Sequence, residues 1–191
     1  MREKKYITRT VFLIAGLTLF FSFLLYLIIT NTSLSNMVDK NKTELINYRI
    51  NGILAILERK NDRLKLSENI PVYQNAFQES ALMEIHKSYC LDLEKSAFFS
   101  IISRNGESLK HTTHKEIMNK ELPVKIREKI IRKNSGEFTD KIDGKRYWLI
   151  FKHYPDWDWF VIYSIPLINK YSAILPFYML AAVSAAVPFI I

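Results

Sequence analysis

The chain has 191 residues, of which 49% are hydrophobic, and a formal net charge of +8. Both of its ends are strongly apolar, which excludes an ordinary soluble domain along the whole length. After Arg2, Lys4, Lys5 and Arg9, cations and anions are interspersed through the middle of the chain. That distribution is typical of a solvated surface, so the sequence predicts no nucleic-acid partner. The single cysteine, Cys90, excludes a disulfide within one chain and leaves one between two chains open.

The first apolar segment lies close to the N-terminus. Val11 to Ile29 carries no charge, and a helix of that length spans about 28 Å, close to the hydrocarbon thickness of a bilayer. The basic residues of segment 1–10 favour a cytoplasmic N-terminus. A cleaved signal peptide is the alternative, but the run is long for one and no small-residue cleavage site follows it. We therefore predict a first transmembrane helix over residues 11–30.

The region after this segment is predicted to be one long helix from Asn36 to Leu66. Its apolar residues recur at spacings of four and three, which places them on one face. They are Ile46, Ile50, Ile53, Leu57 and Leu64. We expect this stripe to pack on a sheet of the same chain, and the membrane-proximal part of the helix to pair with a second copy. The predicted assembly is a homodimer through the long N-terminal helix.

Two shorter helices and a second apolar segment are predicted further along. Pro71 to Leu93 and His114 to Lys133 have helical periodicity, and Pro123 interrupts the second of them. Ala173 to Ile191 carries no charge, so a second transmembrane helix is predicted over residues 171–191, with a buried terminal helix as the alternative. Because the chain stops inside this segment, either the sequence is part of a longer protein or the protein ends in the membrane.

The strands are recognised by their apolar runs and by the turns between them. Asn105-Gly106 and Asp143-Gly144 are typical of two-residue hairpin turns, and Pro155-Asp156 separates two further runs. Two strands are expected at 96–103 and 108–112, and three more between Gly136 and Pro166. The predicted fold class is α+β, with a five-stranded antiparallel sheet, a long N-terminal helix and two flanking transmembrane helices.

Several stretches of this sequence carry a resemblance to a known family. They are the hairpin FFSIISRNGESL, the GEF that opens the third strand, and YWLIFKHYPDWDWFVIYSIP directly before the second apolar segment. Together with the element order, they resemble a single Cache domain, a PAS-like sensor of bacterial chemoreceptors, histidine kinases and cyclic-nucleotide-synthesising enzymes. The resemblance implies that residues 31–170 are extracytoplasmic, between two spans of the inner membrane. It also implies that a small molecule, a carboxylate or an amino acid, binds between the sheet and its covering helices.

Alternation along the fourth strand gives it two different faces. The face expected to pack under the long helix holds Tyr147, Leu149, Phe151 and His153. The other face mixes aromatic surface with cations, as a pocket for an anion requires. The predicted ligand site on that face consists of Arg146, Trp148, Lys152 and Tyr154. Trp148 and Tyr154 would form its walls, and Arg146 or Lys152 would pair with a carboxylate. The alternative is an amphipathic strand whose cations reach solvent.

No catalytic chemistry is predicted within these residues. The chain contains no Gly-rich phosphate loop, no Gly-x-Ser-x-Gly and no His-Glu-x-x-His, and its four histidines lack ligand spacing, so neither a metal nor a cofactor is expected. The predicted function is the ligand-sensing input module of a membrane receptor of the histidine kinase, diguanylate cyclase or chemoreceptor type, whose catalytic output would lie beyond Ile191. The alternative is a membrane-anchored protein-interaction module without a small ligand.

Overall fold

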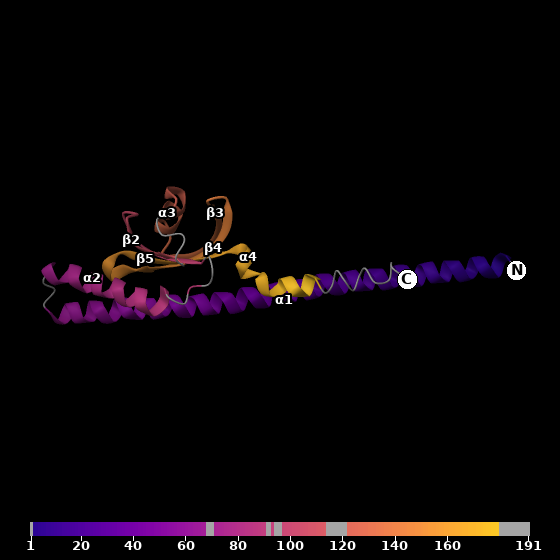
Figure 1. The fold of residues 1–191 in the computed structure, drawn as a ribbon, viewed down its shortest axis with the longest axis horizontal. Coiled ribbons are helices and arrows are strands. Elements are labelled where there is room, and N and C mark those ends of the chain that lie inside the picture. The colour runs from indigo at the N-terminus through magenta and orange to yellow at the C-terminus, as the bar shows by residue number, and fades with distance from the viewer. Residues whose placement is uncertain (1, 68–70, 91–92, 94–96, 114–121, 180–191) are drawn as a thin grey trace. The chain divides into compact units, whose positions relative to one another are not determined.

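The computed structural model describes residues 2–67, 71–90, 93, 97–113 and 122–179. The chain divides into two compact units. One unit consists of Met1–Lys40 together with Tyr171–Ile191, and the other consists of Asn41–Lys170. The elements in chain order are α1 (Arg2–Leu66), α2 (Pro71–Ile85), the π-helix η1 (His86–Cys90), β1 (Phe98–Ser103), β2 (Ser108–Thr113), α3 (Val124–Ile131), β3 (Ser135–Ile142), β4 (Lys145–Tyr154), the 3₁₀ turn η2 (Pro155–Trp157), β5 (Trp159–Pro166), α4 (Leu167–Lys170) and η3 (Ser172–Ile174) (Figure 1).

The predicted order of helices and strands is confirmed. α1 ends at Leu66 as expected, and α2 begins at Pro71. α3 starts directly after Pro123, whereas the earlier part of the predicted helix, 114–121, lies outside the described residues. The five strands form one sheet in the order β2-β1-β5-β4-β3, and every neighbouring pair is antiparallel. The α+β fold class with a five-stranded antiparallel sheet and a long N-terminal helix is therefore correct.

The turn between β3 and β4 forms for the reason that the sequence suggested. Asp143 and Gly144 both have positive φ, at 51° and 77°, as the two central residues of a type I′ turn require. Glycine adopts this conformation without steric cost, and aspartate tolerates it better than most residues. The turn fixes the register so that Thr139 lies opposite Trp148.

One face of the sheet packs against α1 and α2, and we call this packed layer the α1-facing core. Ile46, Ile50, Ile53 and Leu57 belong to it, and the fifth residue of the predicted stripe, Leu64, is also buried. The sheet residues of the layer are Phe99, Ile101, Trp148, Ile150, Tyr154, Trp159, Val161, Tyr163 and Ile165. The helical stripe predicted for α1 is thus confirmed as the cover of one sheet face (Figure 1).

The opposite face of the sheet packs against α3, and we call this layer the α3-facing core. Its members are Phe98, Ile102, Leu122, Ile126, Ile130, Ile142, Tyr147, Leu149, Phe151, Phe160 and Ile162. The prediction that the Tyr147, Leu149 and Phe151 face lies under the long helix is therefore wrong. Both faces of β4 carry large apolar residues, and alternation separates the faces without saying which helix covers each.

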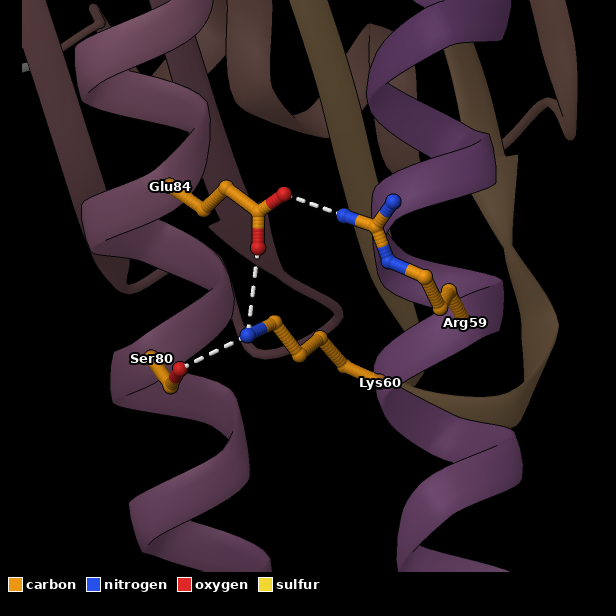
Figure 2. A network of polar contacts seen from close by, with 4 residues as sticks. All are labelled: Arg59, Lys60, Ser80 and Glu84. Carbon is orange, nitrogen blue, oxygen red and sulfur yellow. Dashed lines mark hydrogen bonds and ion pairs between the residues drawn. The ribbon is translucent and has the colours of Figure 1, made fainter.

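A partly exposed polar network joins α1 to α2 (Figure 2). Lys60 Nζ donates to Ser80 Oγ at 2.9 Å and lies 3.1 Å from Glu84 Oε2, while Arg59 pairs with the other oxygen of the same carboxylate. The hydrogen bond from Lys60 lowers the pKa of Glu84, and the charges of Lys60 and Arg59 lower it further. The network fixes the pairing of the two helices along one line of contact.

The unit that contains both chain ends is highly apolar. Most of the described large apolar side chains between Val11 and Ile29 are exposed. Among the described residues, one helix, Ile14–Leu66, is long and apolar enough to cross a membrane, and its most apolar window has a mean hydropathy of 2.0. In the second predicted span, residues 180–191 lie outside the described residues. Within this unit, the Tyr171 hydroxyl donates to Asp39 Oδ1 at 2.8 Å.

Candidate ligand-binding site

The four residues predicted as a site do not share one environment. Trp148 and Tyr154 are buried in the α1-facing core, Arg146 is exposed, and Lys152 is half-buried with its ammonium donating to Asn51 Oδ1 at 2.9 Å. At about 3.4 Å per residue, Arg146 and Tyr154 stand roughly 27 Å apart along β4. One small molecule cannot contact both ends of this set.

The ring of Trp148 already has a cation above it. Lys170, the last residue of α4, places its Nζ 3.5 Å from the ring centroid, and the lysine itself is buried. A desolvated cation–π contact of this kind contributes about 2 kcal/mol. The contact fastens α4, which directly follows β5, to the neighbouring strand β4.

The surroundings of Tyr154 are acidic rather than basic. Its hydroxyl is buried and forms no hydrogen bond of regular geometry among the described residues, although the side chain of Asn61 lies beside it. Burial raises the pKa of Tyr154, and the nearby carboxylates of Asp156, Glu58 and Asp62 raise it further. These carboxylates would repel a ligand carboxylate, so this end of β4 suits a neutral or cationic group better than an anion.

Arg146 lies at the basic end of the β3–β4 hairpin. It pairs in register with Lys141, and the neighbouring Lys145 pairs with Ile142. All three cations are exposed. Their arrangement attracts anions to the hairpin surface, where solvent screens each contact.

The α3-facing core contains a different kind of polar group. Ser164 in β5 is fully buried, and its Oγ has no hydrogen-bond partner among the described residues. Its register partners are Phe98 on β1 and Leu149 on β4, both members of the α3-facing core. Residues directly opposite in a ladder share a face, so the hydroxyl lies on the side covered by α3. A buried hydroxyl without a hydrogen-bond partner lowers the stability of the fold by about 1–3 kcal/mol. A bound ligand that forms this hydrogen bond would offset the cost.

α3 is tied to the strands on either side of it. Arg127 donates to the Gly106 carbonyl in the β1–β2 turn at 2.5 Å, and Lys129 pairs with Asp140 on β3. The hydrogen bond from Lys129 lowers the pKa of Asp140. Figure 1 shows β2 and β3 rising from the sheet on the side where α3 lies. The helix that covers this face is only eight residues long, much shorter than the α1 cover of the other face.

His153 and Asp158 contact each other at the rim of the α3-facing core. His153 Nε2 lies 2.7 Å from Asp158 Oδ1, and the imidazole stacks on Phe160 with ring centroids 4.6 Å apart. Among the described residues, the buried polar side chains on this face are Ser100, Tyr147 and Ser164. The interior of the face therefore offers the Ser164 hydroxyl and apolar surface to a ligand.

Sequence reasoning missed Ser164, although the chain contains a signal for it. β5, WFVIYSIP, is buried at all eight positions, and Ser164 is its single hydroxyl-bearing aliphatic residue. Ser100 interrupts the apolar β1 strand in the same way. A small polar side chain that is buried in such a strand needs a hydrogen-bond partner within the core.

Residues 41–170 form an α+β domain whose sheet order, antiparallel pairing and long helix agree with the fold that the resemblance to a single Cache domain implies. No protein-family model and no curated protein matches the chain. Among solved structures, it is similar to the one reported as "Structural basis for carboxylic acid recognition by a Cache chemosensory domain", with 14% identity and a TM-score of 0.48, over 66% of this chain and 94% of that chain. It is also similar to the ligand-binding domain of Mlp24 with asparagine, with 16% identity and a TM-score of 0.29, over 41% of this chain and 32% of that chain.

Proposed function

We propose that residues 31–170 form the extracytoplasmic, ligand-sensing input module of a membrane signal-transduction receptor. In this proposal residues 1–10 are cytoplasmic, residues 11–30 and 171–191 are the two transmembrane helices, and the protein resides in the inner membrane. The exposed apolar side chains of the first segment support a lipid environment for it. The preceding basic residues support the orientation.

The observation that carries this proposal is the buried, unpartnered hydroxyl of Ser164 on the sheet face under α3. The other face is filled by apolar side chains of α1 and α2. A small molecule between α3 and the sheet would supply the missing hydrogen bond, and the carboxylate or amino acid class accepts one from a hydroxyl. The set predicted from the sequence, Arg146, Trp148, Lys152 and Tyr154, is a second proposed location, supported by the buried Tyr154 hydroxyl.

Signalling in this proposal depends on the ligand favouring one packing of the domain over another. A ligand with equal affinity for both packings shifts nothing. β5 lies in the centre of the sheet and is followed at once by α4, whose Lys170 is anchored on Trp148. A change under α3 that displaced β5 would reach residues 171–191 through this short connection. The receptor would be of the histidine kinase, diguanylate cyclase or chemoreceptor type.

Thermal unfolding of the full chain in nanodiscs, with and without a panel of carboxylates and amino acids, tests the proposal. A ligand at about a hundred times its Kd stabilises the folded state by about 2.7 kcal/mol. We expect Ser164→Ala to fold normally and to lose most of this stabilisation, whereas Arg146→Ala and Tyr154→Phe retain it. If the ligand stabilisation were lost with Arg146→Ala or Tyr154→Phe but kept with Ser164→Ala, the ligand would instead bind at the β4 residues predicted from the sequence. A panel without any stabilising compound would count against ligand sensing.

The exposed side chains of Leu66 and Val72 favour a second candidate function. They are 86% and 78% exposed and lie on either side of the connection between α1 and α2. Exposed apolar groups of this kind are common at protein-binding surfaces. A membrane-anchored interaction module would bind its partner here without a small ligand. In that case the Leu66→Ser/Val72→Ser variant would lose cross-links to a partner in native membranes, and no compound would raise the melting temperature.

We also propose that the module is a homodimer through α1. Leu45 and Tyr48 are 43% and 76% exposed, and their spacing of three places them on one side of the helix. This side differs from the one that carries Ile46, Ile50 and Ile53 into the α1-facing core. The two apolar sides of α1 would therefore serve the domain and the dimer separately.

A further inference from the structure

The β3–β4 hairpin lies at the same end of the sheet as the end of β5. Tyr147 of β4 pairs in register with Pro166, the last residue of β5. Lys145 and Arg146 come before Tyr147 in β4, so they lie beyond the end of β5. At about 3.4 Å per residue, the turn at Gly144 extends up to roughly 10 Å past Pro166. The hairpin turn is therefore an outermost part of this end of the sheet.

Both connections between this domain and the predicted transmembrane helices leave the sheet at the hairpin end. β5 ends at Pro166 and is followed directly by α4, after which the second predicted span begins. On α1, Arg49 donates to the Tyr163 hydroxyl at 3.1 Å, close to the end of β5. Asn61 accepts from Trp157, in the turn at the other end of β5, so α1 approaches the sheet from the hairpin end. In the proposed topology, the hairpin end of the sheet faces the membrane.

Three exposed cations surround the hairpin turn. Lys141 and Arg146 are register partners. Both lie on the α1 side of the sheet, because Trp148, two residues after Arg146, belongs to the α1-facing core. Lys145 pairs with Ile142 of the α3-facing core, so it lies on the other side. The tip of the hairpin is therefore basic on both faces of the sheet.

These cations are not neutralised by the rest of the domain. In the part of the chain that the structure describes, none of the three has an ion-pair partner, and Asp140, next to Lys141 in the chain, is paired with Lys129 instead. Lys141 and Arg146 also repel each other, because like charges directly opposite destabilise a ladder. A negatively charged partner at the tip would offset this repulsion.

The opposite end of the sheet has a different charge. The turn between β4 and β5 contains Asp156 and Asp158, each of which is paired with a cation. The carboxylates of Glu58 and Asp62 lie near Tyr154, the last residue of β4, at the same end. The end with unpaired cations is therefore the one that faces the membrane in the proposed topology.

We propose that the β3–β4 hairpin contacts anionic phospholipid headgroups of the membrane into which the chain is inserted. The inference rests on the topology of the proposed function, but it requires no ligand. Lysine and arginine side chains are attracted to a negatively charged membrane surface, and the attraction falls off within about 10 Å at 0.1 M salt. Since Lys170 is anchored on Trp148 of β4, the contact would hold the same strand to which α4 is fastened.

Lysine acylation of the full chain in nanodiscs, followed by mass spectrometry, tests the contact. Discs of phosphatidylcholine are compared with discs that contain phosphatidylglycerol as well. We expect Lys141 and Lys145 to react about fivefold more slowly in the anionic discs, because headgroups shield their ammonium groups. Salt at about 0.5 M should remove the difference. Lys133 is the matched control, because it is exposed but lies at the other end of β3, and its rate should not change.

Charge reversal tests the chemistry of the contact, with Lys141 as the reporter. In anionic discs, Lys145→Glu/Arg146→Glu should raise the acylation rate of Lys141 to its rate in neutral discs. The variant removes the like-charge pair of Lys141 and Arg146, so it should not weaken the ladder. Arg132→Glu/Lys133→Glu makes the same change in net charge at exposed positions beyond the other end of β3 and should leave the Lys141 rate unchanged.

The outcomes separate this inference from the proposed function. Equal rates in the two kinds of disc, equal slowing of Lys133, or equal effects of the two double variants would overturn the lipid contact and leave the topology intact. A chain that does not remain with the discs would overturn the topology and the lipid contact together. A ligand panel without a stabilising compound would count against ligand sensing alone, because acylation is measured without ligand.

Discussion

At the scale of single residues, Asn61 connects α1 to the turn between β4 and β5. It is 5% exposed; its Nδ2 donates to Asp156, and its Oδ1 accepts from Trp157 Nε1 at 3.0 Å. Replacement by alanine would leave the buried indole N–H without an acceptor. We expect Asn61→Ala to lower the free energy of unfolding by about 2–3 kcal/mol, measured by denaturant unfolding.

Lys65→Ala is the matched control, because Lys65 also contacts Asp156, at 3.0 Å, but from an exposed position. The hydrogen bond to Asp156 raises the pKa of Lys65, yet solvent screens an exposed pair. Its loss should therefore cost less than the loss of Asn61. An equal cost for the two variants would mean that the charge of Asp156, and not the amide of Asn61, holds the turn.

Neither Asn61 nor Gly52 could be recognised from the sequence. Asn61 reads as one more polar residue on a helix, and its burial depends on a turn 95 residues later in the chain. Gly52 looks like a weak point in α1, but a Cβ there would lie 2.1 Å from the Tyr89 hydroxyl. The reason for each residue is a contact across the fold, which local periodicity does not contain.

At the scale of elements, Glu84 makes the contact between α1 and α2 sensitive to acid. Its pKa lies below the ordinary value of 4.5 because Lys60 donates to it. The network therefore stabilises the fold fully above about pH 4.5 and loses this contribution as the pH falls through the lowered pKa. At pH 7 we expect Glu84→Gln to lower the free energy of unfolding by less than about 1 kcal/mol, because solvent screens this partly exposed network.

The difference between wild type and Glu84→Gln should shrink as the pH falls through the lowered pKa of Glu84, because protonation leaves both proteins with a neutral side chain at this position. Urea unfolding from pH 7 down to pH 3 measures this difference. Glu79→Gln, a change at an exposed glutamate of the same helix, controls for the loss of one charge. A Glu84→Gln cost that stays constant over this range would show that the carboxylate charge is not what joins the helices.

The elements could be predicted from the sequence more fully than their packing. Asp143-Gly144 and the apolar stripe of α1 are local signals, and both proved correct. The sequence separates the two faces of β4 correctly, but the face expected under the long helix is the one that α3 covers, because each face carries large apolar residues. The candidate site was harder still, since the unpartnered state of Ser164 appears only when three strands are aligned.

At the scale of the whole molecule, the proposed dimer and the cover of the sheet use different sides of α1. Leu45 and Tyr48 are exposed, whereas Ile46, Ile50 and Ile53 are buried in the α1-facing core. A two-fold contact through Leu45 and Tyr48 would use the same residues of both copies. Dimer formation therefore does not require the helix to leave the sheet.

Disulfide cross-linking of the full chain in membranes tests the dimer through α1. In a Cys90→Ser background, which removes the single native thiol, Tyr48→Cys should give a dimer band on mild oxidation, because a two-fold contact on this side of the helix brings the two copies of residue 48 together. Glu79→Cys, at an exposed position of α2, is the control and should stay monomeric. Equal cross-linking at both positions, or no dimer with Tyr48→Cys, would contradict the dimer through α1.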